Sequence, residues 1–461
     1  MKALFGTDGI RGEAGRFPLD AATVKTIGFS LARHLAETIP KPVIVIGRDT
    51  RESGEWLEQA LISGASEAGV ECLSAGVITT PGVAFLTRKL EASAGVVISA
   101  SHNPYQDNGI KVFSPSGQKI NDSLEHQIEN DVFRKADVQQ IPDGNLRSDP
   151  SGAPKNTISN LTAAASARHD YLKFLTNEIA NGLSLSGLTI VVDCANGAST
   201  EFAPKLFETL GANVIAINNH PDGRNINLNS GSLHIESLIK EVTKQKADLG
   251  VAFDGDADRA LFVDEKGGYV DGDATLWVLA NYLRAHEKLK DATVVATVMS
   301  NIGLEIALRA AGIRLVRTDV GDKYVLDELL KLEASLGGEQ SGHIIMPELS
   351  LAGDGMITAL SLLRALREAN KTLTQATAGF QQYPQILVNV RVREKVPFAE
   401  LATVQTEVRD VEERLSQKGR LLLRYSGTEP LARVMIEGES QFEIEGYADR
   451  IAGAIKRAIG A

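Results

Sequence analysis

Short apolar stretches rich in Val and Ile recur along the chain, and each is followed by a polar turn and then by a segment of helical periodicity. This alternation is typical of βαβ construction, in which strands alternate with the helices that cover the sheet. Three such units can be aligned. Their first strands are predicted at VIVIG (43–47), TIVVD (189–193) and VVATV (294–298). Their helices are predicted at WLEQALISGASEA (56–68), EFAPKLFETL (201–210) and GLEIALRAA (303–311).

A glycine follows each of these helices, at Gly69, Gly211 and Gly312, just before the next apolar stretch. Glycine adopts a left-handed backbone conformation at little steric cost, so these residues are predicted to end the helices. Second strands are predicted at VECLSAGV (70–77), ANVIAI (212–217) and IRLVRT (313–318). The repetition predicts three related α/β domains in preference to a chance recurrence of a common motif.

The last part of the chain has a different pattern. Strands are predicted at 386–392, 420–425 and 431–437, with helices at 397–415 and up to Ile459. This pattern predicts a smaller α+β domain. Ile141–Asn156 is rich in Pro, Gly, Ser and Asp, and predicts a linker or long surface loop that ends the first domain. We therefore expect four domains, at residues 1–157, 158–253, 254–369 and 370–461. At roughly 150 residues per domain, a chain of 461 residues would suggest one domain fewer.

Composition and charge exclude several classes of protein. A hydrophobic content of 43% is enough for several cores and excludes disorder. The net charge of -11 argues against a nucleic-acid partner, so an anionic ligand would need a local basic cluster. Cys72 and Cys194 have no CxxC spacing, so we expect neither a disulfide framework nor a zinc site, and a cytoplasmic location. No signal peptide or membrane span is predicted.

The segment VVISASHNPYQDNGIKVF places Ser101 and His102 between an apolar strand and a polar turn, and Lys111 in the next strand. A hydroxyl in such a turn can be a nucleophile if a base or cation stabilises its alkoxide, or can carry a phosphoryl group held by cations and a metal. The alternative is a Ser/Asn turn that closes two strands through side-chain to backbone hydrogen bonds.

The segment ADLGVAFDGDADRALFVDEKG places Asp254, Asp256 and Asp258 at alternate positions of a turn. At an effective dielectric of ~20, two carboxylates ~4 Å apart repel by about 4 kcal/mol, so a divalent cation, Mg²⁺ first, is predicted to compensate them. A calcium loop would have Glu265 as its twelfth residue, but its sixth would be Arg259 in place of glycine, and the flanks are predicted strands. A solvated acidic turn is the remaining alternative. Arg259 would pair with the acids or hold a metal-bound phosphate.

Two further turns carry candidate binding groups. LGGEQSGHIIM offers Glu339, Ser341 and His343, which suit sugar hydroxyls and proton exchange, although a surface loop with an incidental histidine has the same letters. RLLLRYSGTEPLARVMIE has a turn between two strands that could bind a phosphate, or form a hairpin with solvated arginines. Its candidate phosphate-binding residues are Arg424, Ser426, Gly427, Thr428 and Arg433. Three further segments could be plain turns: GTDGIRG with Arg11, GRDTRESG, and VGDKYV with Lys323. Together with the motifs above, they suggest a central cleft.

The motifs SASHNP, DGDADR, GEQSGH and RYSGTEP, in this order, resemble the α-D-phosphohexomutase superfamily over essentially the whole chain. FGTDGIRG, TVMSN, GGEQSGH and PDGRNIN resemble its bacterial phosphoglucosamine mutase branch. We therefore expect an α/β protein with three related α/β domains, whose mixed sheets are sandwiched by helices, and a smaller C-terminal α+β domain, all around a central cleft.

The resemblance implies a phosphoserine enzyme that interconverts glucosamine 6-phosphate and glucosamine 1-phosphate, for UDP-N-acetylglucosamine and cell-wall synthesis. It implies that Ser101 carries the phosphate, that Asp254, Asp256 and Asp258 hold Mg²⁺ with it, and that Lys111 and His343 are the acid/base groups. Further implied roles are charge neutralisation by Arg11, Arg259 and Lys111, sugar binding by Glu339 and Ser341, and phosphate binding by Arg424, Ser426, Gly427, Thr428 and Arg433.

The implied ligands are a phosphorylated sugar and a hexosamine or hexose 1,6-bisphosphate, as activator or intermediate, in a monomer or homodimer without nucleic-acid or membrane partners. A phosphomannomutase/phosphoglucomutase acting on unaminated sugars is the alternative, with the GEQSGH loop as the discriminating feature. A non-catalytic sugar-phosphate-binding protein is a third interpretation, against which the retained motifs argue.

Two positions depart from the family: Ala257 replaces the usual Gly of DGDGDR, and Lys323 the usual Arg. Metal binding is expected to survive unless position 257 requires a positive φ.

Overall fold

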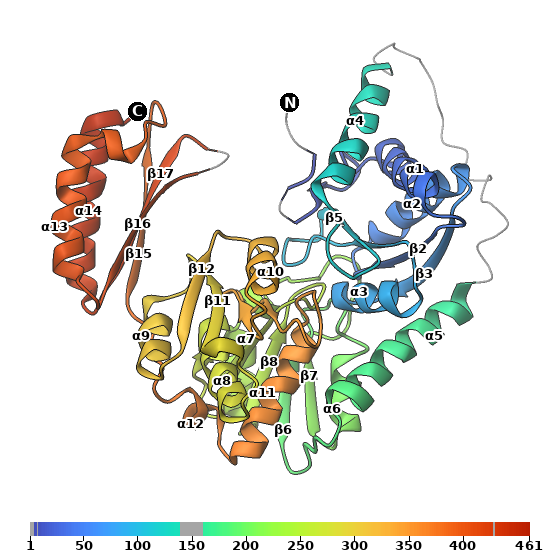
Figure 1. The fold of residues 1–461 in the computed structure, drawn as a ribbon. Coiled ribbons are helices and arrows are strands. Elements are labelled where there is room, and N and C mark those ends of the chain that lie inside the picture. Colours follow the sequence, from blue (N-terminus) through green and yellow to red (C-terminus); the bar gives the residue numbers. More distant parts are fainter. Residues whose placement is uncertain (1–3, 7, 139–159, 427–428) are drawn as a thin grey trace. The chain divides into compact units, whose positions relative to one another are not determined.

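A computed structural model describes residues 4–6, 8–138, 160–426 and 429–461 (Figure 1). The chain forms two compact units. The larger comprises Met1–Val298 and Arg317–Thr377, and the smaller comprises Met299–Val316 and Ala378–Ala461. The predicted linker Ile141–Asn156 lies outside the described residues.

The first sheet of the larger unit has the order β1-β5-β4-β2-β3. Its strands are β1 (Ile10–Glu13), β2 (Val43–Arg48), β3 (Glu71–Val77), β4 (Ala94–Ile98) and β5 (Asp107–Phe113). β2 is parallel to β3 and β4, whereas β5 is antiparallel to β4 and β1. The helices of this region are α1 (Ala21–Thr38), α2 (Gly54–Glu67), α3 (Thr80–Lys89) and α4 (Asp122–Val138). The sheet is therefore mixed, as expected.

The second sheet repeats this topology, with the order β10-β9-β8-β6-β7. Its strands are β6 (Thr189–Asp193), β7 (Asn213–Ile217), β8 (Leu249–Phe253), β9 (Ala260–Asp264) and β10 (Tyr269–Val270). The helices are α5 (Asn160–Lys173), α6 (Ala203–Thr209) and α7 (Glu236–Gln245), with short segments at Phe174–Ile179 (η2) and Gly231–Leu233 (η3). The boundary predicted after residue 253 lies between β8 and β9, which are neighbours in this sheet.

In the third region, β11 (Thr293–Thr297) is parallel to β13 (Gly337–Gly338), which is antiparallel to β14 (Ile344–Ile345). The larger unit also contains η4 (Lys290–Ala292) and the helices α8 (Gly272–Ala285), α10 (Asp322–Lys331), α11 (Gly355–Ala369) and α12 (Leu373–Thr377). α9 (Ile302–Ala310) belongs to the smaller unit, and β12 (Arg314–Thr318) runs from the smaller unit into the larger one.

The shared topology places one predicted motif at the same hairpin of each repeat. The turn from β4 to β5 contains Ser101, and the turn from β8 to β9 contains Asp254, Asp256 and Asp258. The turn from β13 to β14 contains Glu339, Ser341 and His343. In each repeat, this hairpin joins a strand that runs parallel to its neighbour with the antiparallel strand that follows.

The smaller unit has an antiparallel sheet of order β15-β17-β16. Its strands are β15 (Gln385–Arg391), β16 (Arg420–Tyr425) and β17 (Leu431–Glu437), and its further helices are α13 (Ala402–Leu415), α14 (Gln441–Ile459) and the short η5 (Phe398–Glu400). Buried Val, Ile and Ala side chains of the sheet, α13 and α14 form one core. This is the predicted α+β domain.

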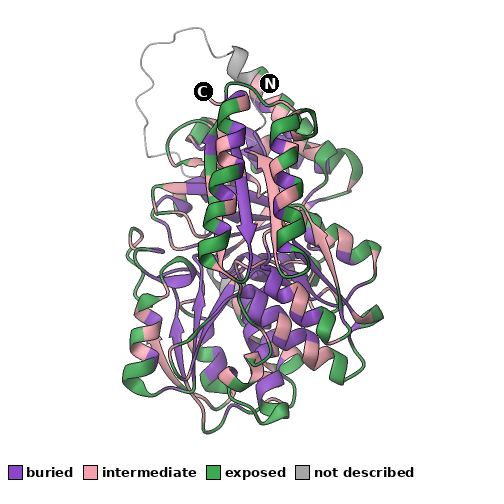
Figure 2. Cartoon of the chain, turned by 90° about the vertical axis from the view of Figure 1, so that its left-hand side faces the viewer, coloured by how far each residue is buried: buried purple, intermediate pink, exposed green. Residues whose placement is uncertain are grey.

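The predicted fold class is confirmed by these sheets and helices. Gly69, Gly211 and Gly312 have φ values of 77°, 96° and 69°, as predicted for residues that end helices. The strands β4, β8, β9 and β11 are buried along their whole length, whereas the helices have both buried and exposed faces (Figure 2). Among the described helices, none is long and apolar enough to cross a membrane.

Candidate active site

Ser101 is buried in the turn between β4 and β5, with the left-handed φ of 53°. Its N–H donates a 2.9 Å hydrogen bond to Ser99 Oγ. Its carbonyl oxygen accepts hydrogen bonds from Arg51 Nη2 at 3.0 Å and from Asn227 Nδ2 at 2.8 Å. A non-glycine residue with positive φ is strained and persists where its surroundings fix it. These contacts hold the Ser101 backbone in that conformation.

Arg51 organises the whole turn that contains Ser101. Its side chain is buried, and its Nε donates to Asp49 Oδ2 at 2.9 Å. The guanidinium also donates to the carbonyl oxygens of Asn103, at 2.9 Å, and Asp107, at 3.0 Å. The rigid fork of donors in a guanidinium suits several acceptors at once.

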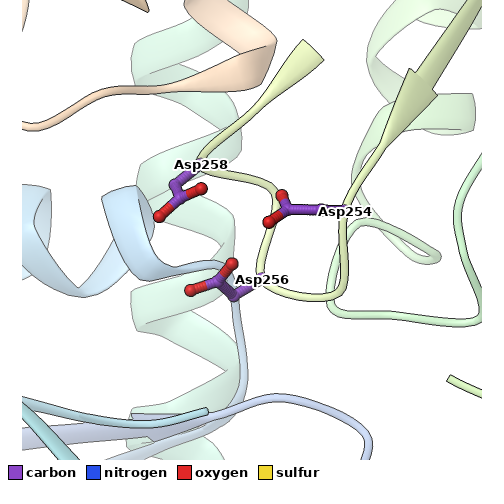
Figure 3. Close-up of side chains that lie close together, drawn as sticks. All are labelled: Asp254, Asp256 and Asp258. Atoms are coloured by element: carbon purple, nitrogen blue, oxygen red, sulfur yellow. The ribbon is translucent and has the colours of Figure 1, made fainter. Parts of the chain in front are cut away.

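Asp254, Asp256 and Asp258 are buried in the turn between β8 and β9, and one oxygen of each lies within 4.8 Å of the others. Their carboxylates converge on one space (Figure 3). Ala257 has φ of 58°, so the position where the family usually has glycine does require a left-handed conformation. The turn nevertheless keeps its three carboxylates together with alanine there.

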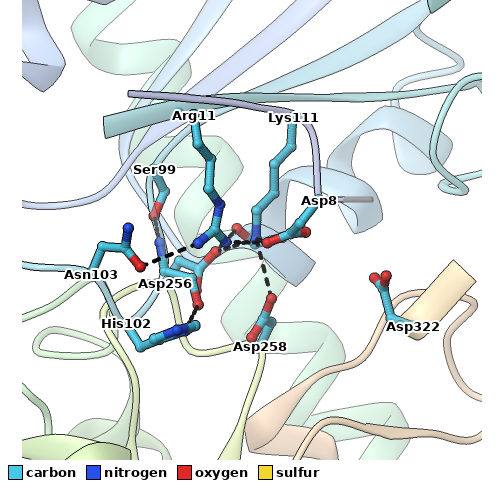
Figure 4. Close-up of polar contacts among 12 residues, drawn as sticks. Asp8, Arg11, Ser99, His102, Asn103, Lys111, Asp256, Asp258 and Asp322 are labelled. Atoms are coloured by element: carbon cyan, nitrogen blue, oxygen red, sulfur yellow. Dashed lines mark hydrogen bonds and ion pairs between the residues drawn. The ribbon is translucent and has the colours of Figure 1, made fainter. Parts of the chain in front are cut away.

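The nucleophile candidate and the acidic turn are in direct contact. The Ser101 hydroxyl donates a 2.5 Å hydrogen bond to Asp254 Oδ2. Lys111 Nζ, which reaches down from β5, donates to Asp256 Oδ2 at 2.9 Å and to Asp258 Oδ2 at 3.2 Å (Figure 4). The structure therefore brings the predicted serine, lysine and three aspartates into one cluster.

The pKa values of Asp254 and Asp258 are shifted in opposite directions by their surroundings. Burial, with Asp258 and Asp256 nearby, raises the pKa of Asp254 well above its usual value. Burial acts the same way on Asp258, but Lys111 and His343 hold its pKa well below the usual value. Burial disfavours the charge of Lys111, but Asp256, Asp8 and Asp258 raise its pKa well above 10.5. One lysine thus neutralises part of the acidic cluster.

The acidic turn has the features of a cation site. Asp256 Oδ1 and Asp258 Oδ1 are buried and have no hydrogen-bond partner among the described residues. A buried carboxylate oxygen without a partner is costly unless an ion satisfies it. Oxygen ligands of this kind are those that Mg²⁺ prefers. The residues present therefore fit a magnesium ion.

His343 and Arg259 lie beside Asp258. His343 Nδ1 is 3.6 Å from Asp258 Oδ1, and Arg259 Nε is 3.8 Å from the same oxygen. Burial favours neutral His343, but Asp258, Asp322 and Glu339 raise its pKa to about 9. His343 is therefore protonated at neutral pH. Within the same turn, Ser341 Oγ donates a 3.2 Å hydrogen bond to Glu339 Oε2.

Arg11 approaches from β1, beside Ser101's turn. Its Nη1 donates to Asn103 Oδ1 at 3.4 Å, and its Nη2 pairs with Asp8. Lys119 Nζ joins Asp8 Oδ1, at 3.0 Å, to Asp322 Oδ1, at 2.8 Å. Burial disfavours the charge of Asp8, but Lys111, Lys119 and Arg11 hold its pKa well below the usual value.

A pocket of about 500 Å³ is lined by several of these groups. Its polar lining residues include Arg11, His102, Arg259, Asp322, Glu339 and His343. Burial, with the charges of Arg259 and Arg11, lowers the pKa of His102 to about 4, so this histidine is neutral. The pocket combines two guanidiniums and a protonated histidine with the carboxylates of Asp8, Asp258, Asp322 and Glu339. It therefore offers cations for a phosphate group and acceptors for sugar hydroxyl groups.

The predicted phosphate-binding residues belong to the smaller unit. Arg424 of β16 and Arg433 of β17 are directly opposite each other. Ser426 N–H donates to Leu431 O at 2.9 Å, and Ser426 Oγ accepts from Glu429 N at 3.3 Å. Gly427 and Thr428 lie outside the described residues. The two arginine side chains therefore leave the same face of the sheet next to the predicted turn, and Arg433 Nη2 lies 3.6 Å from Glu429 Oε2.

Sequence reasoning missed four residues that build this site: Asp8, Arg51, Thr80 and Asn227. Asp8 lies in GTDGIRG and Arg51 in GRDTRESG, two motifs that were recognised without these residues. Asn227 lies in PDGRNIN, which served only for the resemblance. Thr80 carried no signal, because its contact with Asp256 spans 176 positions.

Family descriptions match consecutive parts of the chain. Phosphoglucomutase/phosphomannomutase alpha/beta/alpha domain I matches residues 2–139, domain II residues 169–268, domain III residues 271–383, and the C-terminal domain residues 387–454. A phosphoglucosamine mutase of Solibacter usitatus is 51% identical over 459 residues, which are 100% of this chain and 99% of the relative.

Solved structures share the fold. A phosphoglucomutase/phosphomannomutase family protein of Burkholderia thailandensis has a TM-score of 0.77 at 22% identity, covering 99% of this chain and 98% of that one. The N-acetylphosphoglucosamine mutase of Aspergillus fumigatus, in complex with GlcNAc-6P and magnesium, has a TM-score of 0.63 at 20% identity, covering 99% and 96%.

Proposed function

This chain belongs to the phosphoglucosamine mutase family of the α-D-phosphohexomutases, and we propose that it interconverts glucosamine 6-phosphate and glucosamine 1-phosphate. The resemblance noted in the sequence is thereby confirmed. The observation that carries the proposal is the contact of the buried Ser101 hydroxyl with Asp254, next to Lys111 and two further aspartates. The product would serve UDP-N-acetylglucosamine and cell-wall synthesis.

Ser101 carries the phosphoryl group in this proposal. The bond from phosphorus to Ser101 Oγ breaks as a substrate hydroxyl attacks, which gives a sugar bisphosphate and the free serine. The bisphosphate turns around in the site, and its other phosphoryl group returns to Ser101 Oγ. A sugar 1,6-bisphosphate is therefore the intermediate, and added from outside it would charge an unphosphorylated enzyme.

Lys111 and His343 move the protons. Both pKa values lie above neutrality, so both side chains are charged in the free site. In this state each can donate a proton to Ser101 Oγ as it leaves phosphorus. The group that has lost its proton can then accept the proton of the substrate hydroxyl, so that the transfer leaves the number of protons unchanged. Arg11 and Arg259 supply further positive charge for the phosphoryl group in transit.

Asp254, Asp256 and Asp258 would hold Mg²⁺. Asp256 Oδ1 and Asp258 Oδ1 support this assignment, because both are buried and neither accepts a hydrogen bond from the described residues, as does the magnesium in the Aspergillus fumigatus complex. When bound, the ion supplies a positive charge that stabilises the negative charge on the transferring phosphoryl group. Phosphoryl transfer depends on such charge neutralisation and on in-line positioning.

The remaining residues would bind the substrate. Glu339 is proposed to accept hydrogen bonds from sugar hydroxyls, and Ser341 to donate hydrogen bonds to them. Arg424, Ser426, Gly427, Thr428 and Arg433 are proposed to bind the phosphate that does not react. The opposite positions of Arg424 and Arg433 on neighbouring strands support this role, because two arginines on one face of a sheet suit a phosphate dianion. Both cysteines are free thiols, which supports the predicted cytoplasmic location.

The decisive experiment is a coupled mutase assay with Mg²⁺ and a trace of glucose 1,6-bisphosphate. We expect kcat/KM for glucosamine 6-phosphate to exceed that for glucose 6-phosphate and mannose 6-phosphate by about tenfold or more. Ser101→Ala should lose this activity, and Ser116→Ala, at a serine outside the cluster, should keep it. A preference for an unaminated sugar would overturn the substrate, and activity in Ser101→Ala would overturn the mechanism.

A further inference from the structure

Thr80, the first residue of α3, forms two hydrogen bonds with Asp256. Its hydroxyl donates a 2.5 Å hydrogen bond to Asp256 Oδ2, and its N–H donates a 3.0 Å bond to the Asp256 carbonyl oxygen. Thr80 is only 4% exposed. The preceding Thr79 caps α3, because its Oγ1 accepts from Gly82 N at 3.1 Å. The Thr80 hydroxyl is therefore available to the acidic turn.

The two oxygens of Asp256 have different surroundings. Oδ2 accepts hydrogen bonds from Thr80 Oγ1 and, at 2.9 Å, from Lys111 Nζ. Oδ1 is buried and has no hydrogen-bond partner among the described residues. Two donors on one oxygen fix the plane of the carboxylate, and so fix the direction in which the other oxygen points.

We propose that Thr80 is a positioning residue for the divalent cation: by holding Asp256 Oδ2, it orients Asp256 Oδ1 as the ligand atom. The proposal rests on the proposed function, because that function supplies the cation. Thr80 acts only through Asp256. Its role differs from that of Lys111, because the hydroxyl orients the carboxylate without adding a positive charge that competes with the ion.

The chain offers matched variants. Thr80→Val removes the hydroxyl and keeps the shape, whereas Thr80→Ser keeps the hydroxyl. Thr87→Val is the control, because Thr87 is a buried threonine of the same helix whose hydroxyl donates to the Val83 carbonyl oxygen at 2.8 Å. Thr80→Ala serves by the same criteria if Thr80→Val does not fold.

The test is a titration of the full, EDTA-treated protein with Mn²⁺, with free Mn²⁺ measured by electron paramagnetic resonance. We expect Thr80→Val to raise the Kd for Mn²⁺ by about tenfold or more, and Thr80→Ser and Thr87→Val to stay within about threefold of the wild type. An unchanged Kd in Thr80→Val, or an equal loss in Thr87→Val, would overturn the proposal. So would a wild type that does not bind Mn²⁺.

The proposed function fails separately. A wild type without mutase activity, whose Mn²⁺ binding nevertheless depends on Thr80, would refute the reaction and leave the role of Thr80 intact. Conversely, full mutase activity with a Kd for Mn²⁺ that does not depend on Thr80 would refute only the present inference.

Discussion

Arg51 and Ser101 lie 50 positions apart in the sequence, and the buried Arg51 guanidinium donates a 3.0 Å hydrogen bond from Nη2 to the Ser101 carbonyl oxygen. Neighbouring bonds from the same guanidinium reach Asn103 and Asp107. The position of the proposed nucleophile therefore depends on an arginine from the turn after β2, a residue that need not touch the substrate.

Arg51→Lys tests this dependence. One ammonium cannot serve several carbonyl oxygens in the fixed geometry of a guanidinium, so the Ser101 turn should lose its fixed position. We expect kcat for the mutase reaction to fall by about tenfold or more, because small misplacements of a reacting group are costly. Arg48→Lys is the control, since Arg48 Nε pairs with a single carboxylate, Glu58, at 2.9 Å. Equal activity in the two variants would contradict the role of Arg51.

Ala257 allows a second prediction, through its φ of 58°. Ala257→Gly should keep metal affinity, because glycine adopts this conformation without strain. Ala257→Val should lower it and should destabilise the protein by at least about 1 kcal/mol, because a β-branched residue is strongly disfavoured at positive φ. Mn²⁺ titration and thermal unfolding measure both effects. Tight Mn²⁺ binding by Ala257→Val would show that the acidic turn tolerates another backbone conformation.

The residues that the sequence singled out could be found because they occupy turns with strong local signals, and their chemical roles stay predictions. Ser101 and the three aspartates lie at hairpins next to strands whose apolar pattern was recognisable. The Glu339–His343 turn was found from its polar residues alone, because its flanking strands are only Gly337–Gly338 and Ile344–Ile345. The glycines after the helices were equally legible, because a left-handed residue is a local requirement. Lys111 followed from the predicted strand that begins soon after the Ser101 turn.

The supporting contacts could not be predicted in the same way. Thr80, Arg51 and Asn227 act through contacts with residues more than 45 positions away, which no local pattern encodes. The domain boundaries stay a prediction for a related reason. The boundary placed after residue 253 followed the end of an apolar stretch, but the sheet continues through β9 and β10. Strand pairing across a turn leaves little trace in composition.

Lys119 and Lys323 provide a third prediction. Lys119 pairs with Asp322, the first residue of α10, and Lys323 of α10 pairs with Asp122, the first residue of α4. Lys119→Met leaves the half-buried Asp8 and Asp322 without this partner, and should destabilise the protein by about 2 kcal/mol. Lys323→Met removes a more exposed pair with Asp122 and should destabilise the protein less, because solvent screens an exposed ion pair. Thermal unfolding of both variants measures the difference. Equal melting temperatures would show that the Lys119 bridge is no stronger than a surface pair.

Asp354 and Tyr171 yield a prediction about pH. Tyr171 donates a 2.7 Å hydrogen bond to Asp354 Oδ2, and burial raises the pKa of Asp354 from 3.8 to about 6 despite this bond. A raised carboxyl pKa means that the folded state binds the proton more tightly, so the contribution to stability is present at low pH and is lost as pH rises through about 6. The loss amounts to roughly 3 kcal/mol for this shift.

Asp354→Asn tests this prediction, because asparagine does not titrate. It keeps an acceptor for the first N–H groups of α11, whose hydrogen bonds Asp354 Oδ1 accepts at 2.8 and 3.1 Å. Measured in EDTA, the melting temperature of the variant relative to the wild type should therefore rise between pH 4.5 and pH 7.5, and a difference that does not change with pH would show that Asp354 titrates near its usual value.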